Sequence, residues 1–224
     1  TDASLIRIYF RYICVQNRSM YTEYQPSHLL VPYIDSYWEF KGNPDYGMRI
    51  HILPDGCTDF IFTLGEVANA VEEGSLIMQP YRSYFVGPMT KYSELVTYTE
   101  SIHMFGVRFL PCGLSCFTNL PLHEFVNSRV STNEMKAVFD DTFIEKLGEQ
   151  KHVTDRIRVV EEYLLAYLAR HYQPADSHVA MAVNMINHSK GKRSVRSLMD
   201  DVCLCQRHFE RKFKHYTGFT PKEY

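Results

Sequence analysis

The sequence of 224 residues lacks the features that would place it in several common protein classes. No run of 18 apolar residues occurs, so we expect neither a membrane-spanning helix nor a membrane partner. No glycine-rich phosphate loop, internal repeat or low-complexity segment is present either. Since 45% of the residues are hydrophobic and 14% are aromatic, the composition indicates a folded globular protein rather than a disordered one.

Six cysteines are scattered along the chain rather than densely spaced, at Cys14, Cys57, Cys112, Cys116, Cys203 and Cys205. Secreted disulfide frameworks are usually short and dense in cysteine, so we expect reduced thiols in a cytoplasmic protein. A zinc site built from the pairs 112/116 and 203/205 is the disfavoured alternative, because structural zinc sites usually combine short spacers with nearby histidines.

Residues 1–19 do not have the pattern of a secretory signal. Arg7 and Arg11 interrupt the apolar run 5–15, and no small-residue cleavage site follows it. Alternation within this segment predicts one face of a strand, made by Ile6, Ile8, Phe10, Tyr12 and Cys14. We expect residues 1–19 to be an extension outside the first domain, with Met20 as an alternative start.

Residues 20–150 are predicted to form a β-rich domain. Pro54-Asp55-Gly56 is a turn tripeptide, in which proline presets φ and glycine tolerates a positive φ. Short strands at this spacing favour an antiparallel sheet, sandwich or barrel. The expected strands cover residues 33–40, 48–53, 58–64, 84–86, 94–99 and 102–109.

The pattern then turns helical, after Pro111 and Gly113 end the last strand. We expect helices over residues 114–120, 134–147 and 155–171, the last with Thr154 as its N-cap. Residues 151–175 therefore form a linking helix, which the break at 173–175 ends. Its apolar stripe either packs on the protein's own sheet or, as the less favoured alternative, pairs with a second copy in a homodimer. The stripe consists of Ile157, Val160, Leu164 and Leu168.

Residues 176–224 are predicted to hold three more helices, over 177–188, 195–202 and 206–216, which makes the fold class α+β. Basic residues gather here: nine lysines and arginines stand against five acidic residues, whereas the preceding 175 residues have a net charge of −6. The last two helices bury Leu198, Val202, Phe209 and Phe213. Such a layout is typical of a helix-turn-helix that presents polar side chains to DNA, or otherwise of a solvated packing hairpin.

The end of the chain resembles the first helix-turn-helix of the AraC/XylS family of transcription regulators. The resemblance rests on Leu198, Phe209, the core Arg211-x-Phe213-Lys214 and the exit Gly218-Phe219-Thr220-Pro221. It implies that residues 176–224 are a DNA-binding unit, the first of an expected two. The implied DNA-binding residues are Gln206, Arg207, His208, Arg211 and Lys214, of which Gln206, Arg207 and Arg211 reach base edges.

The front half resembles a sensory domain found ahead of such units. The similar pieces are Tyr37-Trp38-x-Phe40, Pro54-Asp55-Gly56-Cys57-x-Asp59, Val86-Gly87-Pro88 and 106–113. This resemblance implies a β-rich, cupin-like domain that senses a small-molecule effector or mediates dimerisation.

The sequence departs from the family's pattern in three side chains of the helix-turn-helix. Cys203 stands where glycine is usual, so we expect backbone strain there. Cys205 stands where a serine N-cap is usual, and a thiol is expected to cap poorly. Met199 stands where alanine is usual. Tyr224 stands where the connecting helix to a second unit is expected to begin, so we expect either a longer protein or a lost second unit. With one unit of modest surface, this chain alone is expected to bind DNA weakly.

No catalytic residue, cofactor or metal ligand is predicted. His51, His103 and His123 form no close pair with a carboxylate, so we expect structural or surface histidines. Cys57 is expected to be buried rather than nucleophilic, and Asp55 to serve its turn rather than an acid pair with Asp59.

The many aromatic residues either pack the β-core or line an effector pocket. Three functions follow. The first is a DNA-binding regulator with a sensory domain, the second a small-molecule-binding module with weak DNA binding, and the last a cupin-like enzyme.

Overall fold

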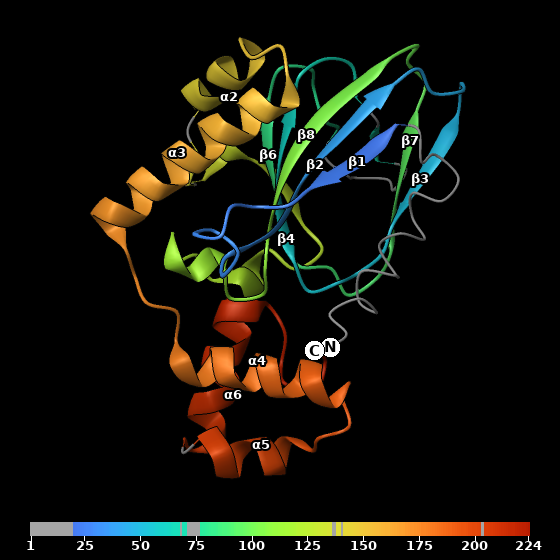
Figure 1. Ribbon diagram of the computed structural model, residues 1–224. Helices are drawn as coiled ribbons and strands as arrows, with labels where there is room; N and C mark the ends of the chain where they lie inside the picture. The colour runs from blue at the N-terminus through green and yellow to red at the C-terminus, as the bar shows by residue number, and fades with distance from the viewer. Residues whose placement is uncertain (1–19, 68, 71–76, 136–137, 140, 203) are drawn as a thin grey trace.

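The computed structural model describes residues 20–67, 69–70, 77–135, 138–139, 141–202 and 204–224. The strand expected within 1–19 and the predicted strain at Cys203 lie outside these residues. Figure 1 shows a β-rich body with helices over one face, and a separate group of three helices below it. The α+β class, with an antiparallel β-rich first part followed by helices, is confirmed.

Two antiparallel sheets form the body. The larger has six strands in the order β1-β2-β8-β4-β6-β9, and the smaller has three in the order β3-β7-β5. The larger sheet consists of β1 (Tyr21–Tyr24), β2 (Ile34–Gly42), β8 (Ile102–Phe109), β4 (Thr58–Thr63), β6 (Ser83–Val86) and β9 (Arg129–Ser131). The smaller consists of β3 (Met48–Ile52), β7 (Ser93–Thr97) and β5 (Asn69–Ala70).

Alternation along the central strands builds a core on each face of the larger sheet. On β8, Phe105 and Val107 join the core on one face, while Met104 joins the core on the other. Gly106 also faces the second core, because a Cβ there would lie only 1.9 Å from Cε2 of Trp38 on the neighbouring strand. The sheet is therefore buried on both sides.

Helices α2 (Asp141–Gly148) and α3 (Val153–His171) cover the first core. Val160 and Leu164 of α3 are fully buried against the sheet, so the apolar stripe packs within its own chain. Arg156, also on α3, stabilises the position of the helix by donating hydrogen bonds to Glu39 Oε1 at 3.1 Å and to the Gln150 carbonyl at 2.6 Å.

Several predicted details were wrong. Helix α3 begins at Val153 with His152 at the N-cap, and no side chain bonds there, so Thr154 is not the cap. The helix expected over 134–147 begins only at Asp141, because Met135 is extended. The helix expected over 114–120 is limited to a 3-10 turn, η1 (Leu114–Cys116). The further short elements η2 (Leu122–Glu124), η3 (Thr132–Glu134), β1, β5 and β9 were not predicted.

The last three helices, α4 (Ser177–Ser189), α5 (Val195–Val202) and α6 (Gln206–Thr217), share a core of their own. Val179 and Ala182 from α4, Leu198 from α5, and Phe209 and Phe213 from α6 are all buried in it. No helix among the described residues is long and apolar enough to cross a membrane.

Candidate nucleic-acid interface and effector cavity

Helix α6 separates its apolar and basic faces cleanly. Phe209 and Phe213 are fully buried against the core of the helical unit. Arg207, Arg211 and Lys214 recur at helical spacing on another face and are exposed. The helix therefore presents a basic surface that its own packing does not need.

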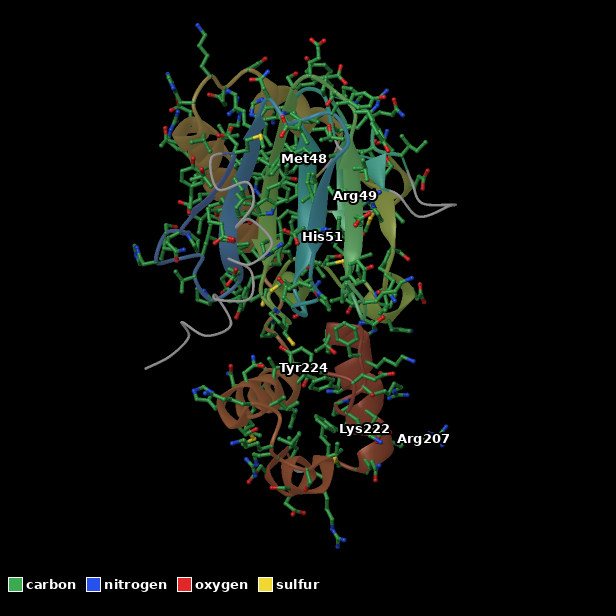
Figure 2. All side chains as sticks on the ribbon, turned by 90° about the vertical axis from the view of Figure 1, so that its right-hand side faces the viewer. Met48, Arg49, His51, Arg207, Lys222 and Tyr224 are labelled. Atoms are coloured by element: carbon green, nitrogen blue, oxygen red, sulfur yellow. The ribbon has the colours of Figure 1, made fainter. Side chains whose placement is uncertain are left out.

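The other two predicted DNA-binding residues flank this surface. Gln206 is exposed and donates to Glu210 Oε1 at 2.8 Å, and His208 is half-buried. Arg211 Nη2 donates to His208 Nδ1 at 3.1 Å, a bond within the helix. Figure 2 shows Arg207 and Lys222 on the same edge of the helical unit. All five predicted residues thus lie on α6 with none enclosed by the β-rich body.

The start of α6 lacks a side-chain cap. Cys205 is the N-cap residue with an extended backbone, φ −68° and ψ 145°, but its thiol accepts no hydrogen bond from the helix. A serine hydroxyl at this position would satisfy one of the free N–H groups of the first turn. The expectation that a thiol caps poorly agrees with this geometry.

Asp176 braces α6 from the start of α4. Its carboxylate caps α4 by accepting from the backbone N–H of His178 and of Val179, each at 3.2 Å, and it accepts from Lys212 Nζ at 2.5 Å. Burial alone would raise the pKa of Asp176, but the hydrogen bond with Lys212 and that with Val179 hold it below its ordinary value. Asp176 therefore fixes α6 relative to α4 in its ionised form.

The helical unit packs against the β-rich body through its C-terminal end. Gly218 ends α6 with φ +87°, and a Cβ there would lie 2.9 Å from Pro88 and 3.1 Å from Val126. Tyr224 lies at the boundary between the two parts, as Figure 2 shows, and its ring would lie 3.0 Å from a Cβ at Gly56. The Pro-Asp-Gly and Val-Gly-Pro pieces noted in the sequence therefore belong to the contact with the helical unit, a role that sequence reasoning missed.

A cavity of about 70 Å³ lies between the two sheets, large enough for several waters. Its walls are almost wholly apolar, and both sheets contribute to them. The aromatic residues thus do both things that the sequence left open, because Tyr21, Trp38 and Phe40 line the cavity while most phenylalanines fill the first core. The other lining residues are Ile50, Ile52, Asp59, Ile61, Val86, Met89, Leu95, Met104, Arg108 and Arg129.

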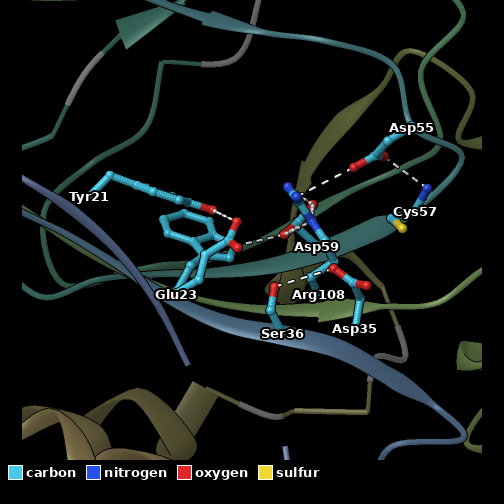
Figure 3. Close-up of polar contacts among 9 residues, drawn as sticks. Tyr21, Glu23, Asp35, Ser36, Asp55, Cys57, Asp59 and Arg108 are labelled. Atoms are coloured by element: carbon cyan, nitrogen blue, oxygen red, sulfur yellow. Dashed lines mark hydrogen bonds and ion pairs between the residues drawn. The ribbon is translucent and has the colours of Figure 1, made fainter. Parts of the chain in front are cut away.

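One side of the cavity carries a buried charged cluster, drawn in Figure 3. Arg108 Nη2 donates to Asp59 Oδ2 at 3.1 Å, and Arg108 Nη1 lies 3.4 Å from Asp55 Oδ2. Trp38 Nε1 donates to Asp59 Oδ1 at 2.7 Å. Asp55 stabilises the turn, since it accepts a hydrogen bond from the Cys57 N–H at 2.9 Å. The interpretation of Asp55 as a turn residue alone was incomplete, because it also pairs with Arg108.

The pKa directions in this cluster follow from burial and ion pairing. Burial raises the pKa of Asp55, although Arg108 opposes this. Burial alone would lower the pKa of Arg108, but Asp59 and Asp55 raise it well above its ordinary value, so its charge is permanent. Burial and the nearby Asp55 raise the pKa of the Cys57 thiol well above its ordinary value, which leaves it protonated and poorly suited to nucleophilic attack.

Arg129 differs from Arg108. It lies on β9 and lines the cavity, yet its Nε atom is buried and has no hydrogen-bond partner. No carboxylate of the described residues forms an ion pair with it, and burial lowers the pKa of its guanidinium. No signal in the sequence distinguished Arg129 from a surface arginine.

The described residues contain no group of three or more histidine, cysteine or acidic side chains that could hold a metal ion. Cys112 is buried in the core of the helical unit, and burial raises its pKa to about 12. His103 contacts Glu39 at 2.9 Å, His51 lies 3.5 Å from Glu94, and the ring of His123 lies near that of His215. These histidines thus have structural or surface contacts.

Comparison with known proteins gives three results. Residues 22–131 match the model of a family described as a domain of unknown function, DUF6597. No curated protein sequence matches the chain. Among solved structures, the AraC-like transcriptional activator CuxR is 11% identical with a TM-score of 0.36, covering 92% of this chain and 84% of that one. ToxT from Vibrio cholerae is 8% identical with a TM-score of 0.28, covering 85% of this chain and 98% of that one.

Proposed function

We propose that the chain is a DNA-binding transcription regulator of the AraC/XylS type. In this proposal residues 176–224 bind DNA through α6, and the β-rich domain senses a small-molecule effector in the cavity between its sheets. The observation that carries the proposal is the exposed basic face of α6, which stands opposite two fully buried phenylalanines. Basic side chains that packing leaves free on such a helix are suited to the major groove.

The side chains of this face divide by chemistry. Arg207, Arg211 and Gln206 carry the planar donor groups that pair with base edges, and Arg211 is central on the face. Lys214 in the last turn suits phosphate contact, which positions a protein on DNA without reading its sequence. The body's net charge of −6 favours approach to DNA through the helical unit alone.

The test is selection of preferred duplexes from a randomised library, followed by fluorescence anisotropy titration at near-physiological salt. Arg211→Ala is expected to cost about 1–3 kcal/mol on the selected site and much less on unrelated DNA. Arg158→Ala is the matched control, because Arg158 is exposed on α3, away from the helical unit. Failure to enrich any duplex, or equal losses for Arg211→Ala and Arg158→Ala, would contradict the proposal.

A second candidate is a small-molecule-binding module whose DNA binding is weak. The uncapped start of α6 favours it, because a frayed first turn would hold Gln206 and Arg207 loosely. Cys205→Ser separates the two candidates. Under the second, the added cap should stabilise the helix by up to about 1 kcal/mol and tighten DNA binding measurably, whereas a regulator already held firmly should gain stability without gaining affinity.

A further inference from the structure

Two histidines meet where the helical unit contacts the β-rich body. His123 lies on η2 of the body, His215 lies in the last turn of α6, and their ring centroids are 6.2 Å apart. Helix α6 packs directly on η2, so the fold holds the two rings near each other. Imidazole nitrogens are common ligands of transition metal ions, and a pair placed in this way can share one ion.

The surroundings of His215 favour its neutral form, which is the form that binds a metal ion. Burial lowers the pKa of His215 and the nearby His123 lowers it further, although Glu124 opposes this. Nε2 of His215 lies 3.3 Å from Asn119 Oδ1. Donation from Nε2 to this amide oxygen leaves Nδ1 with a lone pair, and hydrogen bonds of this kind orient the imidazoles of many metal sites. His215 therefore suits the role of a metal ligand.

The separation of the two rings fits a shared ion. With a metal–nitrogen bond of about 2.0–2.1 Å, the centroid of a bound ring lies about 3.2 Å from the ion, so two such rings are about 5.2 Å apart at the tetrahedral angle and about 6.4 Å apart on opposite sides. The observed 6.2 Å is within this range. His123 is exposed, so rotation of its side chain can bring the rings closer.

An acidic side chain next to the pair attracts a cation. Glu124 follows His123 on η2, is exposed, and lies close enough to His215 to raise its pKa. Its carboxylate can offer an oxygen to the ion, and water can take the remaining positions. Because the described residues contain no preformed group of three histidine, cysteine or acidic ligands, the two imidazoles are the main ligands.

We propose that a divalent transition metal ion such as Zn²⁺ or Ni²⁺ binds between His123 and His215 and holds the helical unit against the β-rich body. Imidazole nitrogen suits these ions, whereas Ca²⁺ and Mg²⁺ prefer oxygen ligands. One ligand belongs to the body and the other to α6, so the ion stabilises only the state in which the two parts are in contact. The proposal goes beyond the function proposed above and requires neither DNA binding nor an effector.

Isothermal titration of the chain with Ni²⁺, with its thiols kept reduced, tests the site. We expect one site that is tighter than the remaining histidines provide. His123→Gln and His215→Gln should each reduce the affinity to that background, and Asn119→Ala should weaken it by about tenfold, as loss of an outer-shell partner does. His51→Gln is the matched control, because His51 is an exposed histidine of β3. Cys205→Ser should also leave the affinity unchanged, which excludes binding at that exposed thiol.

Limited proteolysis tests whether the ion joins the two parts. Saturating Ni²⁺ should slow chymotrypsin cleavage around Tyr172, between α3 and α4, severalfold and should raise the melting temperature by a few degrees. Neither effect should occur in His123→Gln or His215→Gln. Without Ni²⁺ both variants should melt as the original chain does, which shows that they fold. Tight Ni²⁺ binding that survives either substitution, or that leaves the cleavage rate unchanged, would overturn the proposal.

Discussion

Substitution of Lys214 tests which side chains of α6 contact phosphate and which contact base edges. Lys214 is exposed in the last turn, where a contact to phosphate would add affinity without sequence preference. Lys214→Ala should weaken binding to selected and random duplexes alike, and should reduce the slope of log affinity against log salt by about one. Anisotropy titrations at several salt concentrations measure both. A loss confined to the selected duplex would place Lys214 among the base-reading residues.

Gly106 tests the close approach of Trp38 to the central strand. A Cβ there would lie 1.9 Å from the indole, so Gly106→Ala must displace the ring and should lower the free energy of unfolding by about 1–3 kcal/mol. Trp38 fluorescence should shift with it. Gly148→Ala is the control, because no atom lies within 4 Å of a Cβ at that position. Unchanged fluorescence in Gly106→Ala would contradict the packing described.

Residues were predictable where their role is local. Asp55 and Gly56 were identified as a turn because their conformations follow from neighbours in sequence, and the turn's Cys57–Asp55 bond spans two residues. The pairing of Asp59 with Arg108 spans 49 residues, and its partner strand β8 had to be placed first. Arg129 lies on a three-residue strand, too short to show a period, so its position on the cavity wall was not predictable from the sequence.

At the scale of the elements, the stability of α4 depends on the charge of its N-cap residue, Asp176. Asp176→Ala should lower the free energy of unfolding at neutral pH by about 0.5–2 kcal/mol, since two backbone N–H groups and Lys212 lose their acceptor. Because the folded pKa of Asp176 is below its ordinary value of 3.8, this contribution is fully present above pH 3.8 and is lost as the pH falls through the folded pKa.

Urea unfolding followed by circular dichroism, from neutral pH to about pH 3, measures this dependence. The difference between the original chain and Asp176→Ala should shrink at the acid end. Lys212→Met keeps the cap and removes only the ion pair, so it should have the smaller effect at neutral pH. A difference that is constant across the range would show that the cap acts without its charge.

The long elements were predicted well, and the short ones poorly. The apolar stripe of α3 and the runs that became β2, β4 and β8 extend over enough residues for their period to be visible. β5, β9 and the 3-10 turns have two or three residues each, and their pairing is decided by strands far along the chain. Met135 was placed in the helix expected over residues 134–147, but it follows η3 in an extended conformation.

At the scale of the whole molecule, Tyr224 holds the helical unit against the body. Its ring lies against Gly56 and packs on Phe213 at a centroid distance of 5.6 Å. Tyr224→Ala should loosen this contact and free the connection around Tyr172, already 57% exposed, to adopt more conformations, so chymotrypsin should cut there severalfold faster. Tyr46→Ala is the control, because Tyr46 is 84% exposed on the body. Equal cleavage rates would show that Tyr224 does not hold the two parts together.

Arg108 connects the cavity to the contact between the helical unit and the body. It bonds to Asp59, which faces the cavity, and pairs with Asp55, which belongs to the turn beneath Tyr224. An effector that changes the ion pairs of Arg108 with Asp59 and Asp55 would therefore change how the helical unit packs on the body. Thermodynamic linkage then requires the converse: the factor by which effector changes affinity for DNA is the factor by which DNA changes affinity for effector. Adding an operator duplex should therefore move the midpoint of an effector titration read at Trp38. A shift to lower effector concentration would mark the effector as one that promotes DNA binding, and a shift to higher concentration as one that releases it.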